Sequence, residues 1–271
     1  MTATTTFQQP FIVGAPAESG VMWAIRDTLA MTWRNLTTIR RVPQLLVFSL
    51  IQPVIFVLMF RYVFGGAISI PGRSYVDYLM PGIFVQTACF GAMNTAVGLA
   101  EDKGNGLLER LRSLPMSRMA VLAGRVLADT TRNVVVIGLM LGIGVLVGFR
   151  MHSNVAMVLL GLGVLVLFGV SLAWIFAFIG LSVTNGEAAQ AASFPLIAPL
   201  VFASNAFVDP ATMPGWLQWW AENQPVSKAA EAVRACMLGG PTAGPVLTSI
   251  AWSVGISAVV APIAIVRYRR A

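Results

Sequence analysis

The sequence predicts an all-α integral membrane protein with six transmembrane helices, and three observations support this fold class. Apolar residues make up 57% of the 271 residues and charged residues only 11%, whereas soluble domains average about 25% charged residues. The charges are gathered between long uncharged windows, and a spanning helix needs about 20 apolar residues. The expected spans are residues 42–62, 78–100, 130–149, 155–182, 188–208 and 246–266.

Two of the uncharged windows need interpretation. The window 151–186 is long for one helix, but polar residues at 152–154 and 182–186 bracket a single apolar core. The last window is interrupted at 239–245 by three glycines and two prolines. Because these residues break helices, the sixth span is expected to begin near residue 246.

The distribution of positive charge predicts the orientation, because cytoplasmic loops carry an excess of Lys and Arg. With the N-terminus inside, the cytoplasmic segments hold 13 of the 18 basic residues and the external segments hold four, namely Arg73, Arg150, Lys228 and Arg234. Both termini are therefore expected in the cytoplasm. Residues 1–19, rich in Thr, Gln and Pro, are expected to form a disordered tail, and residues 20–271 a single transmembrane domain.

An amphipathic helix is expected before the first span, between Gly20 and Arg41. Its apolar residues recur at spacings of 3, 4, 4 and 3, as expected for a helix that lies in the membrane interface. These residues are Met22, Ile25, Leu29, Trp33 and Leu36. A plain juxtamembrane helix and a helix that docks a partner both fit this pattern.

A charged cytoplasmic loop, residues 101–118, follows the second span. It contains a short amphipathic pattern with apolar positions at Leu107, Leu111 and Leu114 and charged positions at Glu109 and Arg110. Pro115 is expected to end this helix, because the residue before proline disfavours helical geometry. The helix fits either the groove of a cytosolic partner or a loop that packs on its own span ends.

Several classes of chemistry are excluded by what the sequence lacks. The spans contain almost no ionisable residues, so no acid/base pair, activated nucleophile or metal cage can be assembled in the membrane. Two cysteines and one histidine are too few for a disulfide framework or a His/Cys metal cluster, and no G-x-x-x-x-G-K-[ST] phosphate-binding loop is present. This chain is therefore expected to be no enzyme, and its basic charge is topological and does not indicate nucleic-acid binding.

Polar residues inside the spans are the remaining candidates for a site. Four amides are candidate substrate contacts: Gln52, Gln86, Asn94 and Asn205. Such amides also hydrogen-bond neighbouring helices. Asp129 has Arg125 four residues before it and Arg132 three after it, on one helical face. This arrangement fits a structural ion cluster or a proton relay.

Two separated motifs resemble a known family. The loop reads E-x-x-x-x-G-x-x-E-R-L-x-x-L-P-x-S-R at Glu101, Gly106, Glu109, Arg110, Leu111, Leu114, Pro115, Ser117 and Arg118. It resembles the loop of ABC type-2 transporter permeases, the membrane subunits of ABC exporters. The external segment, NAFVDPATMPGWLQ at 205–218, NQPV at 223–226 and EAVR at 231–234, is similar to that of the daunorubicin-resistance subgroup. Gln224 departs from the Asn-Pro that commonly stands in this subgroup.

The resemblance implies an architecture and a set of partners. It implies an N-terminal interfacial helix, six spans, a coupling helix after span 2 and short external re-entrant helices before span 6. Two separate ABC ATPase subunits would bind ATP and Mg²⁺, with no cofactor in this chain. A second permease copy or a related permease, and membrane lipid, complete the expected partners, with no nucleic acid.

The resemblance also implies roles for individual residues. Residues 101–118 would contact the ATPase, with Leu107, Leu111 and Leu114 as the buried stripe and Glu101, Glu109 and Arg110 as polar contacts. The interfacial helix would form the other side of this contact. Outside, Trp216, Trp219 and Trp220 share one helical face and are expected either to anchor the protein at the membrane interface or to form an exit gate.

The resulting functional hypothesis is the transmembrane subunit of an ATP-driven exporter in the plasma (inner) membrane of a bacterium. It would move a hydrophobic or amphipathic compound outward, such as a drug, an antibiotic or a lipid. An ion-coupled secondary transporter or channel that uses Asp129 and acts without an ATPase is the alternative. A scaffold or immunity protein that transports nothing is a third possibility.

Overall fold

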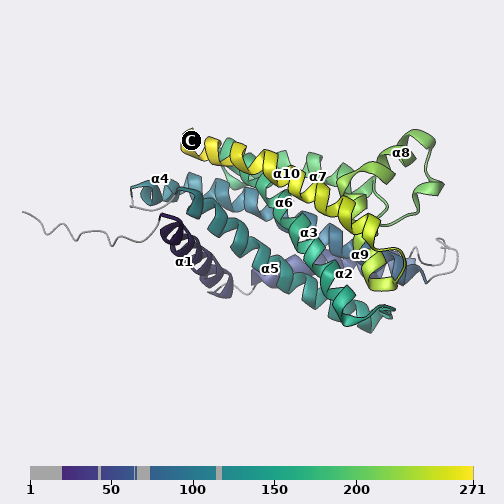
Figure 1. Ribbon diagram of the computed structural model, residues 1–271. Helices are drawn as coiled ribbons and strands as arrows, with labels where there is room; N and C mark the ends of the chain where they lie inside the picture. Colours follow the sequence, from purple (N-terminus) through teal and green to yellow (C-terminus); the bar gives the residue numbers. More distant parts are fainter. Residues whose placement is uncertain (1–19, 42–43, 64, 66–73, 114–117, 271) are drawn as a thin grey trace, which may run out of the picture.

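The computed structural model describes residues 20–41, 44–63, 65, 74–113 and 118–270; the expected N-terminal tail lies outside these ranges. Regular structure in the described residues is entirely helical, without a β-strand. The long helices run alongside one another as a bundle, and both ends of the described chain lie at the same end of it (Figure 1). The all-α part of the expected fold class is confirmed for the described residues.

Among the described residues, four helices are long and apolar enough to cross a membrane. They are α3 (Tyr75–Gly104), α5 (Arg118–Val147), α6 (Val155–Ser182) and α10 (Ala243–Arg270). Helix α6 has the predicted bounds. The other three begin before their predicted spans; α3 and α10 also end later than predicted, whereas α5 ends at Val147 and not at residue 149. Glu101 and Asp102 therefore belong to the last turn of α3 and not to a loop.

The two remaining predicted spans are shorter helices. Helix α2 (Gln44–Leu58) continues as a π-helical turn, η1 (Met59–Val63). Helix α7 (Gly186–Phe202) has 17 residues, a length of about 26 Å at 1.5 Å per residue, against a hydrocarbon core of about 30 Å. The predicted helix 188–208 is therefore wrong beyond Phe202. The six-span count stays a prediction.

The chain leaves helical geometry after Phe202 because side chains from other elements bind its carbonyl groups. The hydroxyl of Tyr78 donates to the carbonyl oxygen of Asn205 at 2.9 Å. The side-chain amide of Gln224 donates to the carbonyl oxygen of Ala203 at 2.8 Å. Gly82 on α3 leaves the necessary space, since an added Cβ would clash with the backbone of Ala206. The segment after α7 is thus held directly on α3.

Three short elements lie between α7 and α10 in the chain. They are the 3-10 turn η2 (Pro210–Thr212), α8 (Gly215–Asn223) and α9 (Pro225–Leu238). Helix α9 is largely buried, whereas in α8 only Ala221 is buried. Both helices lie at the end of the bundle opposite α1 and α4 (Figure 1).

The two helices predicted at the other end are present. Helix α1 (Gly20–Arg41) packs along α5, where Gly124 leaves room for Met31. Helix α4 (Leu107–Arg112) follows α3 after a turn at Gly106, whose φ of 67° is left-handed and favours glycine. Each of these helices therefore has a packing partner within the bundle.

Helix α3 is the centre of the bundle. Its side chains are buried almost continuously from Tyr75 to Cys89. Small residues permit close helix contacts, as is common in membranes; an added Cβ at Gly180 of α6 would clash with the backbone of Ala96 on α3. The core thus fixes α3 relative to the helices around it.

Candidate functional site

A cavity of about 290 Å³ lies between α2, α3, α5 and α7. Its polar lining comes from Ser49, Gln52, Gln86, Thr87, Asn94, Arg132, Asn133 and Gln190. Three of the four amides predicted as substrate contacts, one from α2 and two from α3, therefore line one cavity. The volume lies at the lower end of the range for small-molecule pockets, about 300–1,000 Å³.

Two of the amides in the cavity, Asn133 and Asn94, hydrogen-bond to the protein, whereas the buried amide of Gln86 does not. Asn133 donates to the carbonyl oxygen of Ala88 at 3.2 Å, and Gly91 makes this possible because a Cβ there would clash with the Asn133 amide. Asn94 donates to the carbonyl oxygen of Phe90 at 3.3 Å. Gln86 is only 2% exposed, yet neither of its amide atoms has a hydrogen-bond partner within the described part of the chain.

An ion cluster continues from the cavity between α5, α3 and α1. Arg125 contacts Asp129 through Nε at 3.0 Å and Asp102 at 3.3 Å. Arg132 lies 4.0 Å from Asp129, and Arg34 of α1 lies 4.0 Å from Asp102. The predicted pairing of Asp129 with both flanking arginines is thus confirmed.

The local sequence makes room for this cluster. An added Cβ at Gly98 of α3 would clash with the Arg125 guanidinium, so the glycine lets this side chain lie across α3. The hydroxyl of Thr95 donates to Oδ2 of Asp129 at 3.0 Å, and Asp129 is 5% exposed. The carboxylate is therefore buried, and its Oδ2 atom accepts hydrogen bonds from both Thr95 and Arg125.

Asn205, the fourth predicted amide, does not line the cavity. Its side chain donates to Glu231 at 2.9 Å, and its carbonyl oxygen accepts from Arg234 at 3.1 Å. Arg234 also lies over the ring of Tyr78, 3.9 Å from the centroid. Asn205 therefore joins the segment after α7 to α9 and α3.

In the predicted coupling region, the apolar side of α4 faces the protein's own helices. Leu108 and Leu111 are 2% and 7% exposed and belong to a buried cluster with residues of α1, α3, α5, α6 and α10. Leu107 packs at the edge of this cluster. Glu109 and Arg110 are exposed, as is Glu101. Leu108 was missed because the predicted stripe was drawn through Leu107. Leu114 and Pro115 lie outside the described residues.

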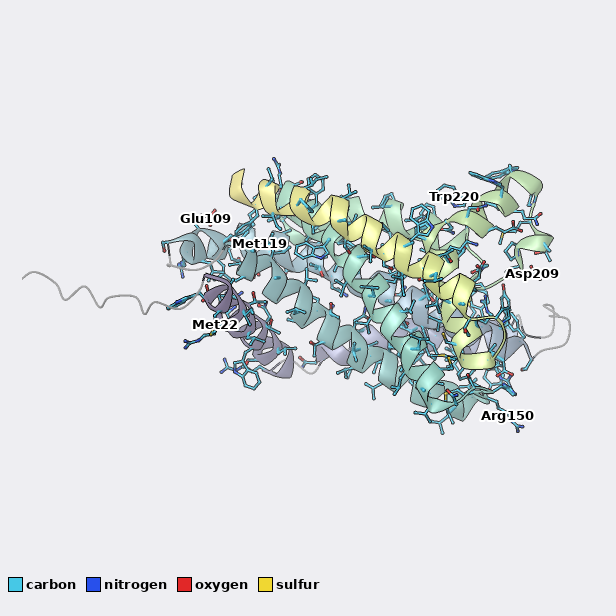
Figure 2. All side chains as sticks on the ribbon, viewed as in Figure 1. Met22, Glu109, Met119, Arg150, Asp209 and Trp220 are labelled. Carbon is cyan, nitrogen blue, oxygen red and sulfur yellow. The ribbon has the colours of Figure 1, made fainter. Side chains whose placement is uncertain are left out.

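The apolar stripe of α1 faces away from the bundle. Met22, Ile25, Leu29 and Trp33 are between 53% and 70% exposed, Leu36 is half-buried, and Met31 on the opposite side is buried against α5. Figure 2 shows Met22 and Glu109 at one end of the molecule and Arg150 and Asp209 at the other. The stripe and the exposed charges of α4 therefore lie at the same end.

The three predicted tryptophans are exposed on α8 at the other end of the molecule. Trp216, Trp219 and Trp220 are 76%, 68% and 43% exposed, and Figure 2 shows Trp220 beside the α8 end of the bundle. They line no part of the cavity. An exposed aromatic face at a bundle end is typical of membrane-interface anchoring.

Sequence reasoning missed part of the cavity. Arg132 was considered only as a partner of Asp129, and Asn133 and Gln190 were not selected. Asn133 could have been selected from the sequence, because it follows Arg132 directly and is a polar residue at the start of an uncharged stretch. Gln190 could have been selected in the same way, because it is a polar residue near the start of the fifth expected span, 188–208.

Comparison with known proteins gives a consistent assignment. Residues 26–238 match the ABC-2 type transporter family. The chain is 36% identical over 246 residues to the daunorubicin resistance ABC transporter permease protein DrrB1 of Streptomyces coeruleorubidus, covering 91% of this chain and 87% of the relative. It is 30% identical over 248 residues to a probable doxorubicin resistance ABC transporter permease protein, DrrC, of Mycobacterium tuberculosis, covering 91% and 90%. A putative transport permease, ycf38, of Cyanophora paradoxa is 25% identical over 214 residues, covering 78% and 73%.

Proposed function

Because this chain belongs to the ABC-2 type transporter family, we propose that it is the transmembrane subunit of an exporter driven by two separate ATPase subunits. The relatives named above are permease proteins, which fits a chain without an ATPase site of its own. The observation that carries the proposal is the polar cavity enclosed by helices that match this family. A second permease, identical or related, would complete the transporter in the bacterial inner membrane.

The proposed ATPase contact is the end of the bundle that carries α1 and α4. Glu109 and Arg110 offer exposed charges there, and the stripe of α1 offers exposed apolar side chains. The buried leucines of α4 belong to a cluster with residues of α1, α3, α5, α6 and α10. A partner that moves α4 would therefore disturb this buried cluster.

The proposed cargo is a hydrophobic or amphipathic compound such as a drug, an antibiotic or a lipid, moved outward. Two relatives carry daunorubicin or doxorubicin resistance in their names. A cavity with amides and one guanidinium among apolar helices offers polar contacts to a compound that enters from the membrane. The export direction follows the family resemblance.

The ion-coupled alternative is less well supported by the geometry. It requires a carboxylate that takes up and releases an ion during transport. Asp129 is 5% exposed and engaged by Arg125 and Thr95, both at 3.0 Å. These contacts favour a structural role for this carboxylate.

Purification of the tagged protein in mild detergent tests the proposal, with co-purification of an ATPase as the readout. The informative variant is the charge exchange Glu109→Arg with Arg110→Glu, because both side chains are exposed and Leu111 is left in its buried position. Arg150→Glu, exposed at the opposite end, is the matched control. We expect the exchange to release the ATPase and the control to retain it.

Two results would contradict parts of this proposal. Retention of the ATPase by the charge-exchange variant would refute the assignment of α4 as the contact. A chain that purifies alone and transports in liposomes without ATP would refute the exporter and favour the secondary transporter.

A further inference from the structure

The cavity between α2, α3, α5 and α7 contains buried polar atoms that the protein itself does not use. Both amide atoms of Gln86 and the NH2 nitrogen of Arg132 have no hydrogen-bond partner among the residues that the structure describes. Buried polar groups are almost always hydrogen-bonded, because an unpaired one has lost its water without compensation. These atoms therefore mark a place where a bound molecule would make hydrogen bonds.

The charge in the cavity is positive. Arg132 has a side chain only 10% exposed and lies 4.0 Å from Asp129, whereas Arg125 and Thr95 engage that carboxylate at 3.0 Å. The described residues that line the cavity include no Asp or Glu. Asp129 is thus the ionic partner of Arg132, but it lies beyond hydrogen-bond distance of the NH2 nitrogen. An anion in the cavity would supply the charge-assisted hydrogen bond that Asp129 does not make.

The cavity has a polar interior, and the exposed residues at its mouth are Phe48, Gln52 and Gln190. Gln86 and Asn133 are buried, whereas Phe48 is 68% exposed. Exposed apolar residues of α2, among them Ile51 and Ile55, continue from this mouth. The volume of about 290 Å³ suits a polar headgroup better than a whole drug-sized compound.

We propose that the cavity binds the anionic group of an amphipathic substrate, with Arg132 and Gln86 as its hydrogen-bond donors and the apolar part at the mouth beside Phe48. This inference rests on the proposed function, because it describes the polar end of the transported compound. It adds the charge and the binding residues, which the family assignment does not supply.

Binding of radiolabelled dodecyl phosphate to the full-length protein in phosphatidylcholine nanodiscs tests the inference. We expect saturable binding to the wild type, weakened about tenfold or more by Arg132→Gln, which removes the charge-assisted hydrogen bond. Gln86→Leu should weaken binding severalfold, because it keeps the volume and removes the amide. Arg150→Gln, an exposed arginine outside the cavity, should bind as the wild type does.

Competition on the wild type separates the sources of the anion and needs no folded variant. Unlabelled dodecyl sulfate should displace the probe, and dodecyltrimethylammonium should not. Equal displacement by inorganic phosphate would overturn the amphipathic assignment in favour of a free-anion site. Displacement by the cationic detergent, or unchanged binding in Arg132→Gln, would overturn the anionic assignment. Because no ATPase or nucleotide is present, these results are independent of the co-purification test.

Discussion

Gly180→Ala tests how closely α3 and α6 approach. The new Cβ would meet the carbonyl oxygen, Cα and carbonyl carbon of Ala96, which are backbone atoms and move only with the helix. Overpacking of this kind costs about 1–3 kcal/mol, against a gain of up to about 1 kcal/mol from replacing a helical glycine by alanine. The backbone clash dominates, so the variant should be less stable by about 1–2 kcal/mol.

Gly163→Ala is the matched control on the same helix. No atom lies within 4 Å of a Cβ at this position, so this variant should be unchanged or more stable by up to about 1 kcal/mol. A thiol-reactive dye measures both variants, because Cys89 and Cys236 are buried and become reactive only on unfolding. Equal unfolding temperatures for the two variants in detergent would refute the close packing of α3 and α6.

Two further predictions concern buried polar groups. Asp129→Asn should lower stability by about 1–3 kcal/mol in the same dye assay, because it breaks a buried ion pair while Arg125 keeps Asp102; an unchanged unfolding temperature would contradict this. Burial raises the pKa of the Cys236 thiol, so the folded protein should react slowly with a maleimide at pH 8, where an unperturbed thiol is partly thiolate. An introduced cysteine at the exposed position Trp216 should react much faster, and equal rates would contradict the burial of α9.

The elements that sequence reasoning predicted well are those fixed by local pattern. Helix α6 has its predicted bounds because 28 residues without charge lie between polar turns, and Asn154 and Asn185 cap α6 and α7 through side-chain hydrogen bonds. Helix α1 follows from the spacing of its apolar residues. Hydropathy and periodicity decide such elements without knowledge of their neighbours.

The features that the sequence did not predict depend on distant residues. Helix α7 ends at Phe202 because side chains from other elements donate hydrogen bonds to the carbonyl oxygens that follow it. Tyr78 of α3 donates to Asn205, and Gln224 at the α8–α9 junction donates to Ala203. In the same way, the gathering of Gln52 and Gln86 in one cavity depends on how α2 packs against α3. Spacing within one helix carries no information on these contacts.

Arg132 belongs both to the ion cluster and to the lining of the cavity. It therefore links the proposed ATPase contact, through the ion cluster, to the proposed substrate site. From α1, the cluster runs through Arg34 and Asp102 to Arg125, and from there to Asp129. Because these pairs connect three helices, a displacement of α1 or α3 relative to α5 must change the distances within them. A change at Asp129 would in turn change its attraction to Arg132 at 4.0 Å, and with it the positive charge that the cavity would present to an anion.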